Sequence, residues 1–148
     1  MAGDRALPAE AGRVVSLYLL DTNVISVAMR APNGVLANRL RLADQAKLYT
    51  SIIVAAELRF GAVKKGSERL KHNVGAVLGG LLVKPIESPV DEVYAEIRSD
   101  LERQGTPIGD ADLWIAAQAL HDDSVLVTDN EREFSRVPKL RIENWLRA

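Results

Sequence analysis

Three apolar runs, each followed closely by an acidic residue, constrain the fold more than any other feature of this sequence. The runs occupy residues 14–20, 47–54 and 124–128 and are rich in residues that favour strands. Asp21 follows the first run, Glu57 lies about one helical turn beyond the second, and Asp129 follows the third. The pattern predicts buried strands that carry carboxylates to their carboxyl ends.

Helical patterns fill most of the sequence between these runs. They cover residues 34–46, 55–65, 67–82, 90–101 and 110–120. Ser88 and Pro89 resemble a capping box with proline at the first helical position of the fourth helix, and further short strands are expected within 83–86 and 140–146. Strands alternating with helices predict a three-layer α/β sandwich with a mostly parallel sheet.

The length and charge of the chain indicate one domain without a general affinity for polyanions. Of the 148 residues, we expect 14–148 to form the domain, and residues 1–13 to be a flexible extension because they are small, polar and aperiodic. The formal net charge is −1, so any contact with nucleic acid has to come from local positive charge.

The absence of cysteine excludes disulfides and cysteine-ligated metal sites. The two histidines, His72 and His121, are too few for an imidazole-built metal site, and we interpret them as surface or helix residues. No apolar run is long enough for a membrane span and no secretory signal is evident, so a cytoplasmic protein is expected. Chemistry in this chain would depend on carboxylates, hydroxyls, amides and basic groups.

The acidic residues are expected to meet at one edge of the sheet. They are Asp21, Glu57, Asp110, Asp112 and Asp129. Ligands of open α/β sheets bind outside the carboxyl ends of the strands, where successive loops converge. Several carboxylates in one place repel one another unless a hard cation joins them, and Mg²⁺ or Mn²⁺ suits oxygen ligands. Such an ion would suit hydrolysis of a phosphodiester.

Each acid also has a purely structural interpretation. Asp21 could cap the following helix, Asp110 and Asp112 could favour a helix N-terminus, Asp129 could belong to a turn, and Glu57 could be solvated. Only the joint placement of these residues favours a site.

Four segments together resemble the PIN-domain ribonucleases, and specifically the VapC toxins of type II toxin–antitoxin systems. They are YLLDTNVIS at 18–26, AAELRFGA at 55–62, TPIGDADLWIAAQAL at 106–120 and LVTDNEREFSRVPKLRIENWL at 126–146. The resemblance implies that Asp21, Glu57 and Asp112 bind the metal. Asp110 falls on a variable position of the motif and is either a cap or an additional charge beside the site.

The resemblance leaves the fourth acid open, because Asn130 stands where the family usually has an acid and Asp129 is one residue early. Asn130 would then hold a metal-bound water or the substrate, while Asp129 supplies part of the charge. Asn23 and Thr128 are expected to orient the acids by hydrogen bonds.

The resemblance further implies metal-dependent cleavage of RNA by an activated water, leaving 5′-phosphate and 3′-hydroxyl ends. It also implies a homodimer and a cognate antitoxin whose C-terminal segment lies in an apolar groove and places a basic side chain at the acids. Basic residues available for the RNA backbone are Arg30, Arg39, Arg41, Arg59, Lys64, Lys65, Arg69 and Lys71. Trp114 and Trp145 are interpreted as packing residues, with base stacking as the alternative.

Two other classes of protein compete with the nuclease interpretation. A phosphoaspartyl phosphatase would need a second Asp where Asn23 stands, and a receiver domain would need Lys84 and Pro85 after the last strand rather than before it. A non-catalytic binding module would use the acids only as caps.

Overall fold

The computed structural model of the chain describes residues 16–147, so the expected extension at 1–13 lies outside the described residues. Strands of this range are β1 (Tyr18–Leu20), β2 (Leu48–Ser51), β3 (Leu82–Lys84), β4 (Val125–Val127) and β5 (Arg141–Glu143). Helices are α1 (Thr22–Arg30), α2 (Val35–Leu42), the 3₁₀ turn η1 (Gln45–Lys47), α3 (Ile52–Lys65), α4 (Glu68–Gly79), α5 (Val90–Arg103), α6 (Asp110–His121) and α7 (Glu131–Phe134). None of these helices is long and apolar enough to cross a membrane.

The five strands form one parallel sheet in the order β3-β2-β1-β4-β5. Leu19 on β1 pairs with Tyr49 on one side and with Leu126 on the other. The chain therefore winds outward in one direction from β1 to β3 and in the other from β4 to β5. The strand order reverses between β1 and β4, and open α/β sheets bind their ligands at such a switch point.

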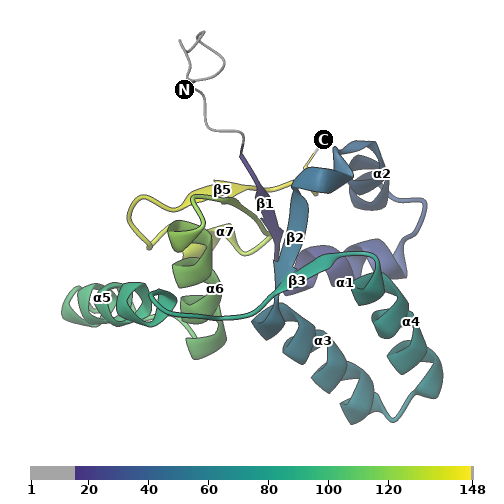
Figure 1. Cartoon of the computed structure of the whole chain (residues 1–148), viewed down its shortest axis with the longest axis horizontal. Coiled ribbons are helices and arrows are strands. Elements are labelled where there is room, and N and C mark those ends of the chain that lie inside the picture. Colours follow the sequence, from purple (N-terminus) through teal and green to yellow (C-terminus); the bar gives the residue numbers. More distant parts are fainter. Residues whose placement is uncertain (1–15, 148) are drawn as a thin grey trace, which may run out of the picture.

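Helices cover both faces of the sheet, which confirms the expected three-layer α/β sandwich. In Figure 1, α5 and α6 lie on one side of the strands, and α1, α2 and α4 lie on the other. Helix α3 extends from the end of β2 and contacts α1, α4 and α6. Because β1, β2 and β4 are buried between the helical layers, their side chains are almost wholly apolar or hydrogen bonded.

Several expected boundaries are corrected by capping groups. The apolar run at 47–54 changes from strand to helix at Ser51, whose hydroxyl accepts a hydrogen bond from the amide of Ile53 at 3.0 Å. The helix expected at 34–46 ends at Leu42, because Asp44 caps the separate turn η1. The expected capping box is wrong: Pro89 is itself the N-cap of α5 and no side chain caps that helix.

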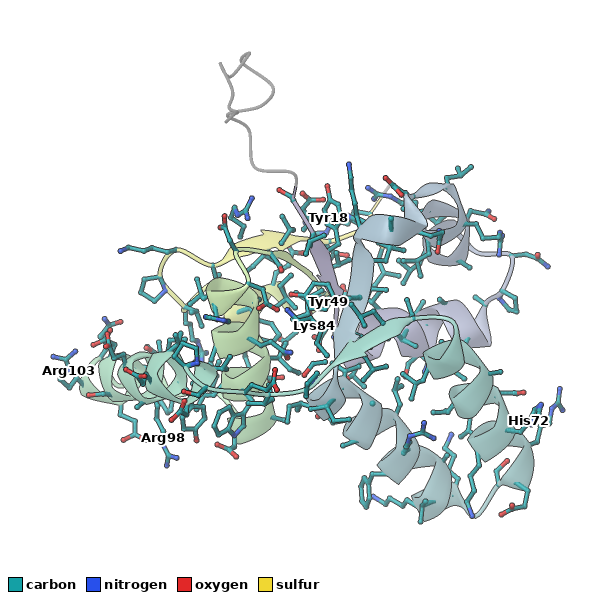
Figure 2. The ribbon with its side chains drawn as sticks, viewed as in Figure 1. Tyr18, Tyr49, His72, Lys84, Arg98 and Arg103 are labelled. Atoms are coloured by element: carbon teal, nitrogen blue, oxygen red, sulfur yellow. The ribbon has the colours of Figure 1, made fainter. Side chains whose placement is uncertain are left out.

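A polar network anchors α6 to the sheet, which matters because the first turn of α6 carries Asp112. Tyr49 of β2 donates its hydroxyl hydrogen bond to Asp122 at 2.8 Å, and the ammonium of Lys84 lies 3.1 Å from the same carboxylate. Tyr49 and Lys84 are labelled side by side in Figure 2. Gln118 of α6 donates hydrogen bonds to the backbone carbonyls of Lys84, the last residue of β3, and of Pro85, each at 3.3 Å.

The two histidines are exposed helical residues, as expected. Figure 2 shows His72 at the outer surface of α4.

Candidate active site

Asp21 lies at the switch point between β1 and β4, where it caps a helix and lies near the other acids. Its Oδ1 accepts a hydrogen bond from the amide of Thr22 at 2.8 Å, which makes it the N-cap of α1. Its Oδ2 accepts hydrogen bonds from the Thr128 hydroxyl at 2.7 Å and from the Asn23 amide at 3.4 Å. The side chain is only 3% exposed, and this burial raises the pKa of Asp21 despite the hydrogen bonds.

Glu57 reaches the same place from the second turn of α3. The hydroxyl of Thr22, the residue after Asp21, donates a hydrogen bond to Oε1 of Glu57 at 2.5 Å. The negative charge of Glu57 contributes to the raised pKa of Asp21, so the two carboxylates are electrostatic neighbours. Thr22 is thus a residue of the site that the sequence analysis does not single out.

Asp112 completes the group from the first turn of α6. Burial is the largest cause that raises its pKa, to about 7, and the charges of Asp21, Glu133 and Glu57 follow in that order. Burial and neighbouring negative charge together favour the neutral form of Asp112. The three acids expected to bind metal therefore lie near enough for their charges to act on one another.

Glu133 is a fourth acid that the sequence analysis missed. It lies in the short helix α7 after β4, and its Oε2 accepts a hydrogen bond from the Asn130 side chain at 3.3 Å. Its charge acts on Asp112, as the pKa of that residue indicates. The signal in the sequence is weak because Glu133 follows a strand by six residues and stands in a single helical turn.

The side chains of Asp129 and Asn130 have different hydrogen-bond partners in the structure. Asp129 is exposed, and its Oδ1 accepts a hydrogen bond from the side chain of Asn144 at 3.0 Å, while its amide donates to the side chain of Asn23 at 3.1 Å. Asn130 donates its amide hydrogen bond to the Thr128 hydroxyl at 2.9 Å and its side-chain hydrogen bond to Glu133. Asn130, rather than Asp129, is hydrogen bonded to Glu133, an acid whose charge acts on Asp112.

Asp110 lies on another side of α6. It is the first residue of the helix, after the N-cap Gly109, and its carboxylate accepts a hydrogen bond from the Tyr94 hydroxyl on α5. Its charge is not among those that raise the pKa of Asp112. The helix-cap alternative for Asp110 is wrong because Gly109 occupies the cap.

Two of the eight basic residues border the acids. Arg30 and Lys65 line a groove of about 190 Å³ together with Glu57 and Thr22. Arg39, by contrast, lies 5.4 Å above the ring of Trp145, a buried residue packed against Tyr18 of β1. Trp145 is therefore the packing residue that the sequence analysis expected.

The oxygen-only ligand set fits a hard divalent cation, although the side chains are not arranged around one. Among residues 16–147, no three acidic or histidine side chains are grouped closely enough to hold one metal ion as they stand. The electrostatic coupling nevertheless spans four carboxylates. Mg²⁺ commonly keeps several waters and uses one or two protein carboxylates, so three direct ligands are not required.

Comparison with known proteins identifies the family. The sequence model of the PIN domain matches residues 18–140, which contain all four acids. The chain belongs to the PIN-domain family. Its site occupies the carboxyl edge of the PIN-domain sheet.

Relatives within the PIN-domain family are named VapC ribonucleases. Ribonuclease VapC2 of Rickettsia felis is 36% identical over 131 residues, covering 87% of this chain and 98% of the relative. The tRNA(fMet)-specific endonuclease VapC of Shigella flexneri is 34% identical over 132 residues, covering 86% of this chain and 97% of the relative. By these similarities the chain also belongs to the VapC branch of the PIN-domain family.

Solved structures agree with the sequence relatives. The crystal structure of VapBC2 from Rickettsia felis bound to a DNA fragment from its promoter contains a chain with a TM-score of 0.80 and 35% identity, covering 87% of this chain and 98% of that chain. A chain of the DNA-bound VapBC structure from Salmonella typhimurium has a TM-score of 0.79 and 32% identity, covering 88% of this chain and 99% of that chain.

Proposed function

We propose that this chain is a metal-dependent endoribonuclease, acting in the cytoplasm as the toxin of a toxin–antitoxin pair. The observation that carries the proposal is the group of neighbouring acids at the switch point: burial first, and then the charges of Asp21, Glu133 and Glu57, raise the pKa of Asp112. A divalent cation neutralises such a group, and phosphodiester hydrolysis is the chemistry that it supports. We infer that the substrate is RNA because the VapC relatives are named as a ribonuclease and a tRNA-specific endonuclease.

Mg²⁺, with Mn²⁺ as a substitute, is the cation that we propose for the site. Asp21, Asp112, Glu57 and Glu133 would hold it, directly or through water. When bound, the ion lowers the pKa of a water that attacks phosphorus and stabilises charge on the phosphate oxygens. Asp129 would contribute longer-range charge from its exposed position.

The neighbouring polar residues hold the acids in place. Thr128 and the amide of Thr22 fix the two oxygens of Asp21, while the hydroxyl of Thr22 fixes Glu57. Asn23 joins Asp21 to the loop after β4. We propose that Asn130 orients Glu133 through its side-chain amide. These residues are positioning residues, since each one acts through an acid.

Cleavage of RNA by the purified protein tests the function. We expect Mg²⁺ or Mn²⁺ to support cutting, EDTA to stop it, and Asp112→Ala to reduce the rate by at least about 100-fold. Asp91→Ala, which removes an exposed acid of α5 that is not among the charges acting on Asp112, is the matched control and should cut normally. Equal cutting by Asp112→Ala, or cutting that survives EDTA, would refute the proposed site.

We propose that a cognate antitoxin occupies the groove beside Glu57. The groove lies between α1, α3 and α4, and its apolar wall includes Met29, Leu58, Leu70 and Val74. The similar structures from Rickettsia felis, Salmonella typhimurium and Haemophilus influenzae are VapBC structures, which supports a partner of this kind. A C-terminal antitoxin segment in the groove would bring a basic side chain to the acids.

A groove-filling substitution tests the antitoxin site. A Cβ at Gly61 meets no atom within 4 Å, so Gly61→Leu should fold and fill the groove that it lines. Gly79→Leu on α4 adds the same side chain outside the groove. Calorimetry should show weakened binding of the antitoxin only for Gly61→Leu. Unchanged binding by this variant would place the antitoxin elsewhere.

We also propose that two copies associate through α3. Phe60 and Val63 are 65% and 60% exposed, and Ile52 lies on the same face of the helix. An apolar stripe of this kind marks an interaction surface. In sedimentation, Phe60→Glu should be monomeric while Leu42→Glu, at an exposed leucine of α2, should stay dimeric. A dimeric Phe60→Glu variant would move the interface to another face.

A further inference from the structure

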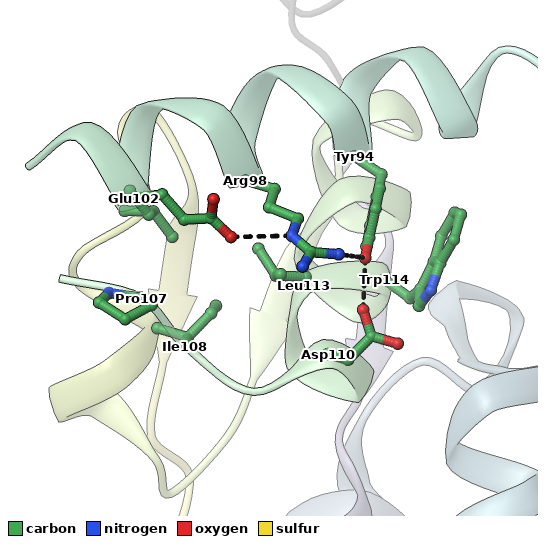
Figure 3. A pocket seen from close by; sticks show the side chains of 9 residues that line it. Tyr94, Arg98, Glu102, Pro107, Ile108, Asp110, Leu113 and Trp114 are labelled. Carbon is green, nitrogen blue, oxygen red and sulfur yellow. Dashed lines mark hydrogen bonds and ion pairs between the residues drawn. The ribbon is translucent and has the colours of Figure 1, made fainter. Parts of the chain in front are cut away.

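A second cavity lies on the other side of the first turn of α6. It measures about 390 Å³ and is bounded by α5, α6 and the loop between them (Figure 3). Its lining includes Tyr94, Arg98, Pro107, Ile108, Asp110 and Trp114. None of the four clustered acids lines this cavity, so it is separate from the proposed metal site.

An aromatic pair forms one wall of the cavity. The rings of Tyr94 and Trp114 are stacked, with centroids 3.9 Å apart and planes inclined by 15°. Arg98 donates a hydrogen bond to the Tyr94 hydroxyl at 2.9 Å and another to Glu102 at 2.9 Å, as Figure 3 shows. These bonds hold the aromatic pair in a fixed orientation, and a rigid π surface suits stacking of a planar base.

Asp110 supplies a hydrogen-bond acceptor at the rim of the same cavity. The Tyr94 hydroxyl donates to Oδ1, and no side chain among residues 16–147 donates to Oδ2. An ionised carboxylate only accepts hydrogen bonds and can accept two parallel ones. Among the four RNA bases, guanine alone presents two adjacent donors, N1–H and N2–H, on its Watson–Crick edge.

The cavity and the acids flank the same helical turn. Asp110 and Asp112 are two positions apart on α6, so their rise along the axis is only about 3 Å while they face different sides of the helix. We propose that this cavity holds a guanine base of the RNA, packed against Tyr94 and Trp114, with Asp110 accepting its N1–H and N2–H. The inference rests on the proposed ribonuclease function and adds a preference for guanine near the cut.

Binding of single nucleotides tests the cavity without requiring cleavage. GMP, AMP, CMP and UMP carry the same phosphate, so a difference between them reports the base alone. In EDTA, we expect GMP to quench the tryptophan fluorescence of the protein saturably and to bind about 10-fold tighter than the other three nucleotides. Equal affinities for all four, or no saturable binding of GMP, would overturn the proposal.

Two substitutions locate the bound base. Trp114→Phe should remove the fluorescence change, because the remaining Trp145 is buried elsewhere, while calorimetry should still detect GMP. Asp110→Asn, which keeps the shape of the side chain, should weaken GMP binding about 10-fold and leave the other nucleotides within about twofold. An unchanged preference for GMP in Asp110→Asn would contradict the assigned contact, and circular dichroism confirms that each variant is folded.

Mapping of cut sites connects the cavity to the reaction. On a random RNA pool, the native protein should cut preferentially beside guanosine, and Asp110→Asn should lose that bias. If the native protein cuts nothing, the proposed nuclease function fails while the nucleotide titration still decides the cavity. If the native protein cuts without a guanosine bias, the cavity proposal fails and the nuclease function stands.

Discussion

At the scale of single residues, the site is defined by charge that the protein alone does not neutralise. Asp21 accepts three hydrogen bonds, whereas no side chain among residues 16–147 donates one to the carboxylate of Asp112, whose pKa is raised by burial and by neighbouring acids. Burial of a carboxylate among like charges favours its protonated form. The metal-free protein should therefore be less stable at a pH where Asp112 must ionise.

The pH dependence of stability follows from this shift. The pKa of Asp112 is about 7 in the folded protein and about 3.9 in an unfolded chain, so between these values the folded state binds the extra proton. The melting temperature of the metal-free protein should fall as pH rises from 5 to 8, and Asp112→Asn should reduce that fall. The control variant Asp91→Asn should show the same fall as the native protein. Scanning fluorimetry in EDTA measures the melting temperatures of the native protein and both variants.

Thr22 offers a second prediction at this scale. Its hydroxyl fixes Glu57, so Thr22→Val should raise the Mg²⁺ concentration needed for half-maximal cleavage by about 10- to 100-fold. Thr22→Ser keeps the hydroxyl and should restore the native requirement. A valine variant with native Mg²⁺ dependence would show that Glu57 needs no such support.

At the scale of elements, the sequence predicts most helix starts to within one residue, whereas the strand expected at 47–54 ends three residues earlier than the apolar run. The acid after β1 marks the strand end because an apolar run is followed by a polar capping residue, and the structure has that arrangement at Asp21. The bounds of α1 are not predicted although its first residues follow a capping acid, and α7 is a single turn too short to give a helical period. Glu133 was missed for the same reason, since its approach to Asp112 depends on tertiary folding.

The sheet makes a testable distinction between its centre and its edge. Leu126 on β4 is fully buried, so Leu126→Ala should lower the free energy of unfolding by about 2–5 kcal/mol. Leu82 on the edge strand β3 is 63% exposed, and Leu82→Ala should change the free energy of unfolding by less than about 0.5 kcal/mol. Urea denaturation compares the two variants, and similar losses would mean that β3 is covered in solution.

At the scale of the whole molecule, the distribution of charge matters more than its total. The net charge of −1 gives no general attraction for RNA, yet Arg30 and Lys65 stand in the groove beside Glu57. These two basic side chains, beside an otherwise acidic site, would bind the phosphates on either side of the cleaved bond. This arrangement makes binding depend on a few positions rather than on the overall field.

The salt dependence of RNA binding tests this arrangement. Replacing Arg30 with Gln should reduce the slope of log affinity against log salt concentration by about one. Arg41→Gln, on α2 and hydrogen bonded to the carbonyl of Pro32, should leave the slope unchanged. Filter binding with an Asp112→Asn background prevents cleavage during the measurement, and equal slopes for both variants would exclude Arg30 as a phosphate contact.

Asp21 combines a cap of α1 with a place among the clustered acids, and this combination bears on how activity can be lost. A residue at this position that cannot accept hydrogen bonds would remove the N-cap of α1 and also abolish activity. The variant protein should therefore be less stable and prone to proteolysis. Asp112 caps nothing, and its loss should leave a durable, inert copy. Such an inactive copy could still bind the antitoxin that we propose as the inhibitor of the active protein.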